Sequence, residues 1–203
     1  MNGVEGKREE VREEAISRTK SDCVRAVRSL DAVLRVVGMA LSLVAAVIVG
    51  IDKETEVVAI TIVNTLPPLH IPISAKWYYM SAFVYFMVAN AIACSYAAVS
   101  LIIVALAIKP TKEITTQNDA VKLALLIADL LMVALLFSAN GAAAAVGLIG
   151  LHGNSHANWK KVCNVFRTFC RYSTTAFAMS MIGSFVFLWL VLLGTLNLHK
   201  KSK

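Results

Sequence analysis

The sequence predicts an all-α membrane protein, a bundle of four transmembrane helices. Composition is the first reason: 58% of the 203 residues are hydrophobic and only 16% are charged, whereas soluble domains carry about 25% charged residues. Mean hydropathy is +0.68, which points the same way. The third reason is distribution, because the charged residues gather at the chain ends and between four long apolar segments. Each segment is long enough to cross a hydrocarbon core of about 30 Å.

Hydropathy divides the chain into membrane spans, loops and two tails. The predicted spans cover residues 32–51, 81–108, 121–150 and 174–197. The remaining segments are outer loops at 52–80 and 151–173, a cytoplasmic loop at 109–120, and cytoplasmic tails at 1–31 and 198–203. The second span is followed by Lys109 and Pro110, a charge and a helix breaker typical of a membrane exit.

Lys and Arg residues outside the spans set the predicted orientation. The N-terminal tail carries seven, the loop around Lys109 and Lys112 three when Lys122 at the start of the third span is included, and the C-terminal tail three, against six in the two outer loops. An excess of positive charge marks the cytoplasmic side. We therefore predict that both termini are cytoplasmic, which requires an even number of spans. The net charge of +7 suits a negatively charged leaflet, and no basic stripe with aromatic residues indicates nucleic-acid binding.

The N-terminal tail is polar and rich in charges of both signs. We favour a solvated, partly disordered tail. The alternative is a helix from Val11 to Leu30 that binds a partner or the membrane surface, because Glu and Arg three and four residues apart support a helix. Cys23, just before the first span, is either palmitoylated or, the state we favour, an unmodified thiol.

The first outer loop favours a short extracellular β-hairpin. Residues Val57 to Val63 have the β-branched composition of a strand, and the proline-rich stretch from Leu66 to Pro72 follows in extended conformation. Trp77, Tyr78 and Tyr79 then precede the second span. Such aromatic residues anchor helices at the headgroup level, and we prefer this role to a ligand-binding aromatic cage.

The second outer loop contains Cys163 and Cys170, a candidate disulfide in an oxidising compartment. Seven residues of straight helix span about 10.5 Å, whereas bridged Cα atoms lie less than about 7 Å apart. A disulfide therefore requires a bend between residues 164 and 169, and two free thiols are the alternative. Trp159 is a further candidate interfacial anchor. His152 and His156 are four residues apart, but Gly153 favours a turn there, and we predict no metal site.

Small residues recur every fourth position in two of the spans. The second span has Ala89, Ala93 and Ala97, and the fourth has Ala176, Ser180 and Ser184. Such spacing lets the backbones of membrane helices approach closely. We favour packing within one bundle over packing between protomers.

The third span contains a carboxylate, Asp129, eight residues after Val121. An acidic side chain near the centre of a membrane helix costs at least about 2.5–3.5 kcal/mol, so it faces the protein interior and pairs with another group. The first span has a cation near its entrance, Arg35.

These features together resemble the CASP-like proteins, the plant family related to the Casparian strip membrane domain proteins and more distantly to MARVEL-type four-span proteins. The resemblance covers Leu34 to Lys201. It rests on Arg35, Asp129, LPPLHIPISAKWYYMSAFVYF in the first outer loop, and ANGAAAAVGLIGLHGNSHANWKKVCNVFRTFC across the third span and second outer loop. The pattern GNSH-x2-W-x2-VC-x6-C indicates subfamily 1.

The resemblance implies a plasma-membrane protein with cytoplasmic termini that forms homo- and hetero-oligomers. Founding members of the family scaffold a membrane domain that guides local cell-wall modification. Those members carry an acidic, aromatic first-loop signature of the ESLPFF type, whereas this chain reads NTLPPLHIP. The departure argues against the Casparian-strip role itself and leaves the membrane-scaffold interpretation unchanged.

The resemblance also implies a structural intramembrane ion pair between Arg35 and Asp129. Both residues lie in the cytoplasmic half of their predicted spans, and a long arginine side chain can cover the remaining gap. A guanidinium meets a carboxylate through two parallel hydrogen bonds, which neutralises both charges before they contact lipid.

Two function classes follow from the sequence. The first is a non-enzymatic scaffold whose partners are further copies of itself, related four-span proteins, the lipid bilayer and extracellular wall enzymes. The alternative is a small transporter or channel with Asp129 as an intramembrane ion site. All four prolines lie in predicted loops, so no broken helix typical of carriers is expected, and we expect Asn140 near Ser138 to make an interhelical hydrogen bond. No catalytic or phosphate-binding motif is evident, and we predict no cofactor.

Overall fold

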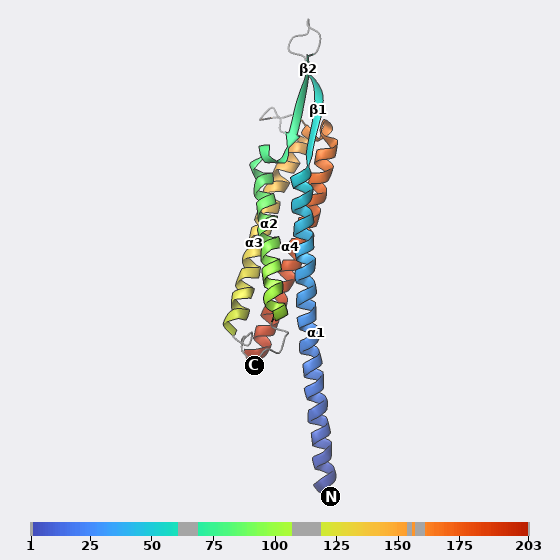
Figure 1. Ribbon diagram of the computed structural model, residues 1–203, viewed down its shortest axis with the longest axis vertical. Coiled ribbons are helices and arrows are strands. Elements are labelled where there is room, and N and C mark those ends of the chain that lie inside the picture. Colours follow the sequence, from blue (N-terminus) through green and yellow to red (C-terminus); the bar gives the residue numbers. More distant parts are fainter. Residues whose placement is uncertain (1, 61–68, 107–118, 154–155, 157–160, 203) are drawn as a thin grey trace.

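The computed structural model describes residues 2–60, 69–106, 119–153, 156 and 161–202. Four long helices form an elongated bundle with a two-stranded hairpin at one end (Figure 1). All four helices are long and apolar enough to cross a membrane, over Arg25–Ile51, Ser81–Ala105, Ala120–His152 and Arg167–Asn197. The predicted fold class, an all-α four-span membrane protein, is confirmed.

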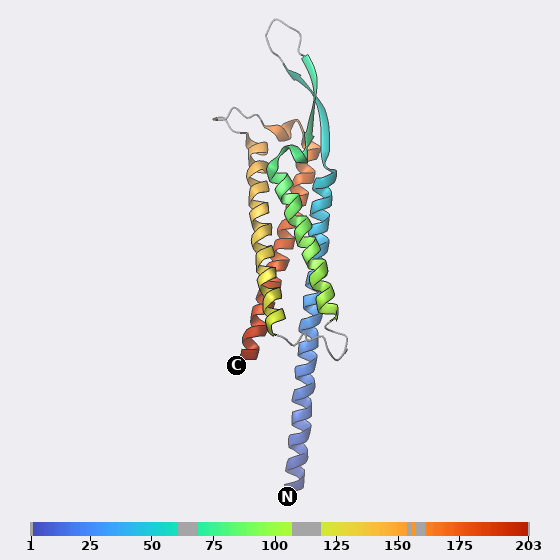
Figure 2. The same ribbon diagram turned by 60° about the vertical axis from the view of Figure 1, so that its left-hand side comes forward.

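The first helix, α1 (Asn2–Ile51), begins far before the membrane span. Its N-terminal half extends well beyond the rest of the bundle (Figures 1 and 2). The favoured interpretation of residues 1–31 as a partly disordered tail is therefore wrong for residues 2–31, which are helical. Two features favour the continuity: α1 contains no proline to interrupt it, and its sequence places Glu and Arg three or four residues apart at several positions, a spacing that allows ion pairs along a helix.

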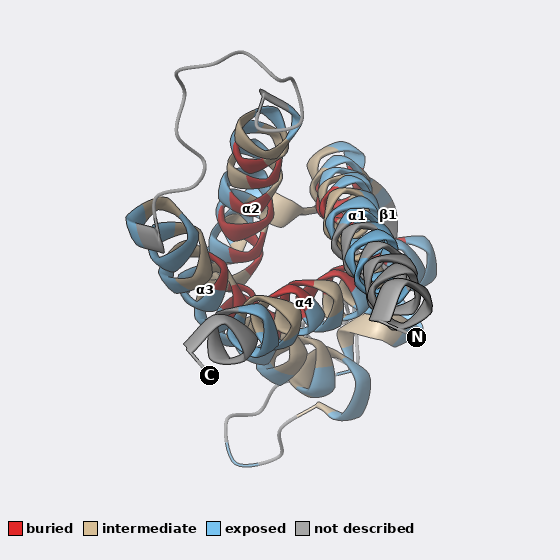
Figure 3. Cartoon of the chain, turned by 90° about the horizontal axis from the view of Figure 1, so that it is seen from below, coloured by how far each residue is buried: buried red, intermediate tan, exposed pale blue. Residues whose placement is uncertain are grey.

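The other helices are α2 (Ser81–Leu106), α3 (Asp119–His152) and α4 (Arg167–Ser202). Each helix packs against two neighbours, in the order α1, α2, α3, α4 and back to α1. Buried residues lie on the sides of the helices that face one another (Figure 3). Helix α4 begins seven residues before the predicted span at 174, and the last two residues of the predicted second span, 107 and 108, lie outside the described residues.

The predicted hairpin is present. Strand β1 (Lys53–Ile60) begins directly after α1 and pairs antiparallel with β2 (Leu69–Lys76), with Lys53 opposite Lys76. The first strand thus begins four residues before the predicted Val57, because the polar residues at its start also pair; the Thr55 and Ser74 hydroxyls lie 3.0 Å apart. Residues 61–68, which include the rest of the predicted strand and two of the loop prolines, lie outside the described residues. A short 3-10 turn, η1 (Trp77–Tyr79), leads into α2.

Two hydrophobic clusters form the core, separated by a polar layer. The cluster nearer the hairpin, called the outer cluster after that end of the bundle, includes Val49, Phe83, Phe86 and Phe169. The cluster farther from the hairpin, called the inner cluster, includes Leu136, Phe187 and Leu190. Between them every helix contributes a fully buried polar side chain: Ser42 from α1, Asn90 from α2, Asn140 from α3, and Ser180 and Ser184 from α4. The Asn140 amide donates to Ser184 Oγ at 3.0 Å, which links α3 to α4. Ser138 points elsewhere, and the Tyr85 hydroxyl donates to its Oγ at 3.2 Å.

Small residues allow α1 and α4 to approach closely. An ideal Cβ on Gly38 would lie 3.3 Å from Phe187 Cε2, and one on Gly183 would lie 3.5 Å from Leu41 Cβ. The recurrent Ala89, Ala93, Ala97, Ala176, Ser180 and Ser184 are all buried, which agrees with packing inside one bundle.

We expect Gly183→Leu to lower the melting temperature of the detergent-purified protein, because the added side chain separates α1 from α4. Overpacking of this kind costs about 1–3 kcal/mol. Gly141→Leu on α3 is the matched control, since a Cβ at Gly141 meets nothing within 4 Å. Equal melting temperatures for the two variants would contradict this packing.

Candidate functional site

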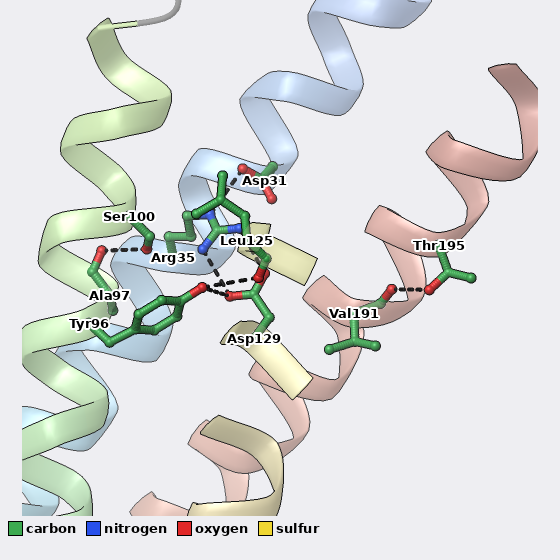
Figure 4. Close-up of polar contacts among 9 residues, drawn as sticks. All are labelled: Asp31, Arg35, Tyr96, Ala97, Ser100, Leu125, Asp129, Val191 and Thr195. Carbon is green, nitrogen blue, oxygen red and sulfur yellow. Dashed lines mark hydrogen bonds and ion pairs between the residues drawn. The ribbon is translucent and has the colours of Figure 1, made fainter. Parts of the chain in front are cut away.

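A buried ion pair joins α1 to α3. Arg35 Nη1 donates to Asp129 Oδ1 at 3.1 Å, and Arg35 Nη2 donates to Asp129 Oδ2 at 2.9 Å. Arg35 and Asp129 are each only 3% exposed. Figure 4 shows the guanidinium and the carboxylate pointing toward each other between the helices. The pair thus has the two-bond geometry that is strongest and most directional for arginine and a carboxylate.

Two more side chains complete this ion-pair network. Arg35 Nε donates to Asp31 Oδ2 at 3.1 Å, one helical turn earlier on α1. The Tyr96 hydroxyl of α2 donates to Asp129 Oδ1 at 2.6 Å and lies 3.2 Å from the Leu125 carbonyl oxygen. Figure 4 shows these residues converging from α1, α2 and α3.

The ion-pair network leaves little hydrogen-bonding capacity unused. Asp129 Oδ1 accepts bonds from Arg35 and Tyr96, and Asp129 Oδ2 accepts one from Arg35. The guanidinium is bound on both of its sides, by Asp31 and Asp129. Buried charges are tolerated when they are paired and hydrogen-bonded in this way. The arrangement fixes three helices at one depth and offers no free oxygen of Asp129 toward the bundle interior.

A second set of polar contacts ties the hairpin to α4 at the outer end of the bundle. Asp52, between α1 and β1, is buried, and its Oδ2 accepts a bond from Ser173 Oγ at 3.1 Å. Glu54 Oε2 on β1 accepts a hydrogen bond from the backbone N–H of Phe169, with an N–O distance of 2.8 Å. That N–H lies in the first turn of α4, where backbone donors lack helical partners and a carboxylate is favoured.

Cys163 and Cys170 form a disulfide with Cα atoms 5.7 Å apart. Cys163 lies in a short 3-10 turn, η2 (Val162–Asn164), and Cys170 lies in the first turns of α4. The chain bends between these elements, at Val165 and Phe166, within the interval that the spacing requires. The two residues are therefore not on one straight helix, which removes the distance objection.

The aromatic residues before α2 divide into two environments. Trp77 packs against the outer cluster and donates its indole N–H to the Gly50 carbonyl at 3.1 Å, so it ties η1 to the end of α1. Tyr78 and Tyr79 are exposed, with Lys76 Nζ 5.5 and 5.8 Å from their ring centroids. The anchor role of these two tyrosines stays a prediction. In the alternative, an aromatic cage for a ligand, the position of the ligand's cation is taken by Lys76 of the same chain.

Residues 24–186 match the family described as the Casparian strip membrane protein domain, a range that contains both the ion pair and the disulfide. The chain belongs to this family. It is 54% identical over 174 residues to CASP-like protein 1E1 of Vitis vinifera, covering 86% of this chain and 83% of that protein. CASP-like protein 1E1 of Glycine max is 44% identical over 202 residues, covering 100% of both chains.

A third relative, CASP-like protein 1E1 of Arabidopsis thaliana, is 46% identical over 171 residues, or 84% of this chain and 87% of that protein. No solved structure matches. The predicted assignment to the CASP-like family, subfamily 1, is confirmed. The more distant relation to MARVEL-type proteins stays a prediction.

The structure describes only some of the remaining candidate residues of this CASP-like protein. Trp159 lies outside the described residues, as does the side chain of Cys23. His152 ends α3, and Gly153 follows with φ of 72°, a backbone conformation that favours glycine. Among the residues that the structure describes, no three His, Cys, Asp or Glu side chains are grouped so that they could hold a metal ion.

Several residues of these sites were not predicted from the sequence. Asp31 had a local signal, because it lies four residues before Arg35 on the same helix and such pairs interact. Tyr96, Asp52, Glu54 and Ser173 had none, since their partners are at least 29 positions away along the chain. Only the fold brings them together.

Asp52 gives this CASP-like protein an acid-dependent stability at its outer end. Burial raises the pKa of Asp52 to about 6, and the nearby charge of Glu54 adds to the rise, against the hydrogen bond from Ser173. The folded state binds the Asp52 proton more tightly than the unfolded state, in which the pKa of Asp52 is about 3.9. The contribution of Asp52 to the free energy of unfolding is therefore full below about pH 4 and is lost as the pH rises to about 6. After allowance for solvent screening it amounts to about 1–2 kcal/mol.

We therefore expect the melting temperature of wild type, relative to Asp52→Asn, to fall between pH 4 and pH 6 and to stay constant above pH 6. Thermal unfolding of both proteins in detergent at each pH measures this difference, and titration of other carboxyl groups cancels in the comparison. Parallel pH profiles would contradict the assignment to Asp52.

Proposed function

We propose that this CASP-like chain is a non-enzymatic scaffold of the plasma membrane. It assembles with itself and with related four-span proteins into homodimers, heterodimers or larger oligomers, and it recruits extracellular wall enzymes. Its termini are cytoplasmic. Family membership supports this proposal, and the observation that carries it is the ion-pair network, which uses the membrane-embedded charges to hold helices together.

The shape of the molecule suits a scaffold. Helix α1 extends beyond the bundle at one end and the hairpin extends at the other (Figure 1), so both sides of the membrane receive a projecting element. The N-terminal end of α1 and the C-terminal end of α4 lie at the same end of the bundle (Figure 2). Together with the excess of Lys and Arg in the tails, this arrangement supports cytoplasmic termini.

The transport alternative finds no support in the geometry of Asp129. A coupling carboxylate needs an oxygen that an ion or a proton can reach. Here the three hydrogen bonds to Asp129 come from Arg35 and Tyr96, and the side chain is only 4% exposed. Transport would require this network to open during each cycle, so an ion site at Asp129 is the less favoured function.

Single-molecule tracking tests the scaffold. A fluorescently tagged chain in its native plasma membrane should diffuse slowly and in clusters, and Asp129→Asn should fail to reach the surface because its bundle is unstable. Asp31→Asn is the matched control, since the partly exposed Asp31 contributes one bond to the network. Freely diffusing monomers, together with a folded Asp129→Asn variant that has lost a solute or proton current, would overturn the proposal.

A further inference from the structure

A cavity of about 320 Å³ lies at the outer end of the bundle, between α2, α3, α4 and η2. Its lining is apolar over most of its surface. Met80, Phe83 and Phe86 contribute from α2, Ala143 and Gly147 from α3, and Phe177 from α4. Small residues on α3 make the space, because an ideal Cβ on Gly147 would meet nothing within 4 Å.

The cavity lies at the depth of the outer leaflet. Met80 directly follows the aromatic residues of η1, and Met80 to Phe86 covers about 9 Å of helix. One leaflet contributes about 15 Å of hydrocarbon. On α3 the lining residues belong to the outermost turns of the helix, within the candidate span Ala120–His152.

The mouth of the cavity opens on the lipid-facing surface. Two of the lining residues on α3, Leu148 and Leu151, are 57% and 50% exposed, and both belong to a membrane-spanning segment. Exposed leucines at this depth contact hydrocarbon, so the cavity is continuous with the interface between the bundle and lipid.

Three exposed cations are close in sequence to the lining residues of the cavity. Lys161 precedes the lining residue Val162, and Arg167 and Arg171 lie on either side of the lining residue Cys170. The nearby carboxylates of Asp52 and Glu54 are already hydrogen-bonded to α4. Such cations at headgroup depth complement a phosphate group.

We propose that this cavity binds one acyl chain of an outer-leaflet phospholipid, with the phosphate at these three cations. An apolar cavity of about 150 Å³ stays dry and accepts benzene, so one of twice that size accepts roughly a dozen carbon atoms. An acyl chain has this size and chemistry and is present at the mouth. The proposal does not depend on the scaffold function and rests only on the proposed orientation, with both termini cytoplasmic.

Photo-crosslinking in reconstituted vesicles tests the proposal. The full-length chain is placed in phosphatidylcholine vesicles that contain a small fraction of phosphatidylcholine with a diazirine in one acyl chain, and labelled residues are mapped by mass spectrometry. We expect labels to concentrate on Met80, Phe86 and Phe177. Gly147→Leu fills the cavity and should reduce these labels roughly tenfold, which corresponds to about 1.4 kcal/mol of binding free energy.

Gly141→Leu is the matched control, because Gly141 lies on the same helix, also has open space around an added Cβ and does not line the cavity. It should leave the labels unchanged. Unlabelled phosphatidylcholine should compete better than a diacylglycerol with the same chains, since only the former carries a phosphate.

Four results would overturn the proposal. Labels spread evenly over the lipid-facing residues of the wild-type protein would show only ordinary annular lipid. This measurement uses the wild-type protein alone, so it does not depend on whether a variant folds. Equal labelling of both glycine variants would place the bound chain elsewhere. Preferential labelling of the cavity by a diazirine sterol, or equal competition by diacylglycerol, would assign the cavity to a different lipid.

Discussion

Asp129→Asn should lower the stability of the purified protein by about 3–5 kcal/mol, the cost of breaking a buried ion pair by removing one charge. The substitution leaves Arg35 buried and opposed only by Asp31. The new amide also places a donor beside the guanidinium, which has only donors. Thermal unfolding in detergent measures the loss, and delivery to the cell surface reports it in the membrane.

Replacing both charges distinguishes a pair from two independent residues. Arg35→Met combined with Asp129→Leu should be more stable than Asp129→Asn alone, because apolar residues of similar volume often replace a buried pair without loss. Tyr96→Phe, which removes one bond to the carboxylate, should cost about 1.5–3 kcal/mol. If the losses from single Arg35→Met and Asp129→Leu variants add in the double variant, the two residues do not act as a pair.

The ion pair also shows what a sequence reveals about such a site. The cost of a carboxylate in a membrane helix is a local property, so Asp129 by itself required a buried partner. Arg35 was the cation in the first apolar segment, and family resemblance joined the two. Tyr96 was not predicted, because a tyrosine in an apolar helix is common and its hydroxyl gives no sign of a partner 33 positions away.

The sequence predicted the presence of the four helices better than it predicted where they begin and end, and the reason is physical. Hydropathy marks where a chain enters lipid, near Ala32, but backbone hydrogen bonds continue upstream through α1 to Asn2. At the other end of the bundle, α4 begins at Arg167 rather than at residue 174. There the disulfide and the Glu54 carboxylate hold the first turn of α4. The pattern of polar and apolar residues along the chain predicts neither contact.

Removal of the disulfide should be the second largest effect. Cys163→Ser combined with Cys170→Ser frees a loop of eight residues, and closing a loop of that length contributes about 2–3 kcal/mol in the chain-entropy account. The loss should be concentrated at the outer end, because η2 is held to α4 there and Phe166 and Phe169 are buried in the outer cluster. We expect faster trypsin cleavage after the exposed Lys161, Arg167 and Arg171, while the inner half of the bundle keeps its protection.

Two comparisons decide whether the disulfide is the cause. Reduction of wild type should reproduce the cleavage pattern of the double serine variant, and Cys94→Ser should not, because Cys94 is a free cysteine on α2, away from this loop. The contacts of Asp52 and Glu54 with α4 do not involve either cysteine side chain, so we expect the hairpin to stay attached while η2 is released. Cleavage that spreads to the base of the hairpin at Lys53 and Lys76 would instead mean that the disulfide holds the whole outer end together. Unchanged cleavage on reduction would mean that buried aromatic residues alone fix this loop.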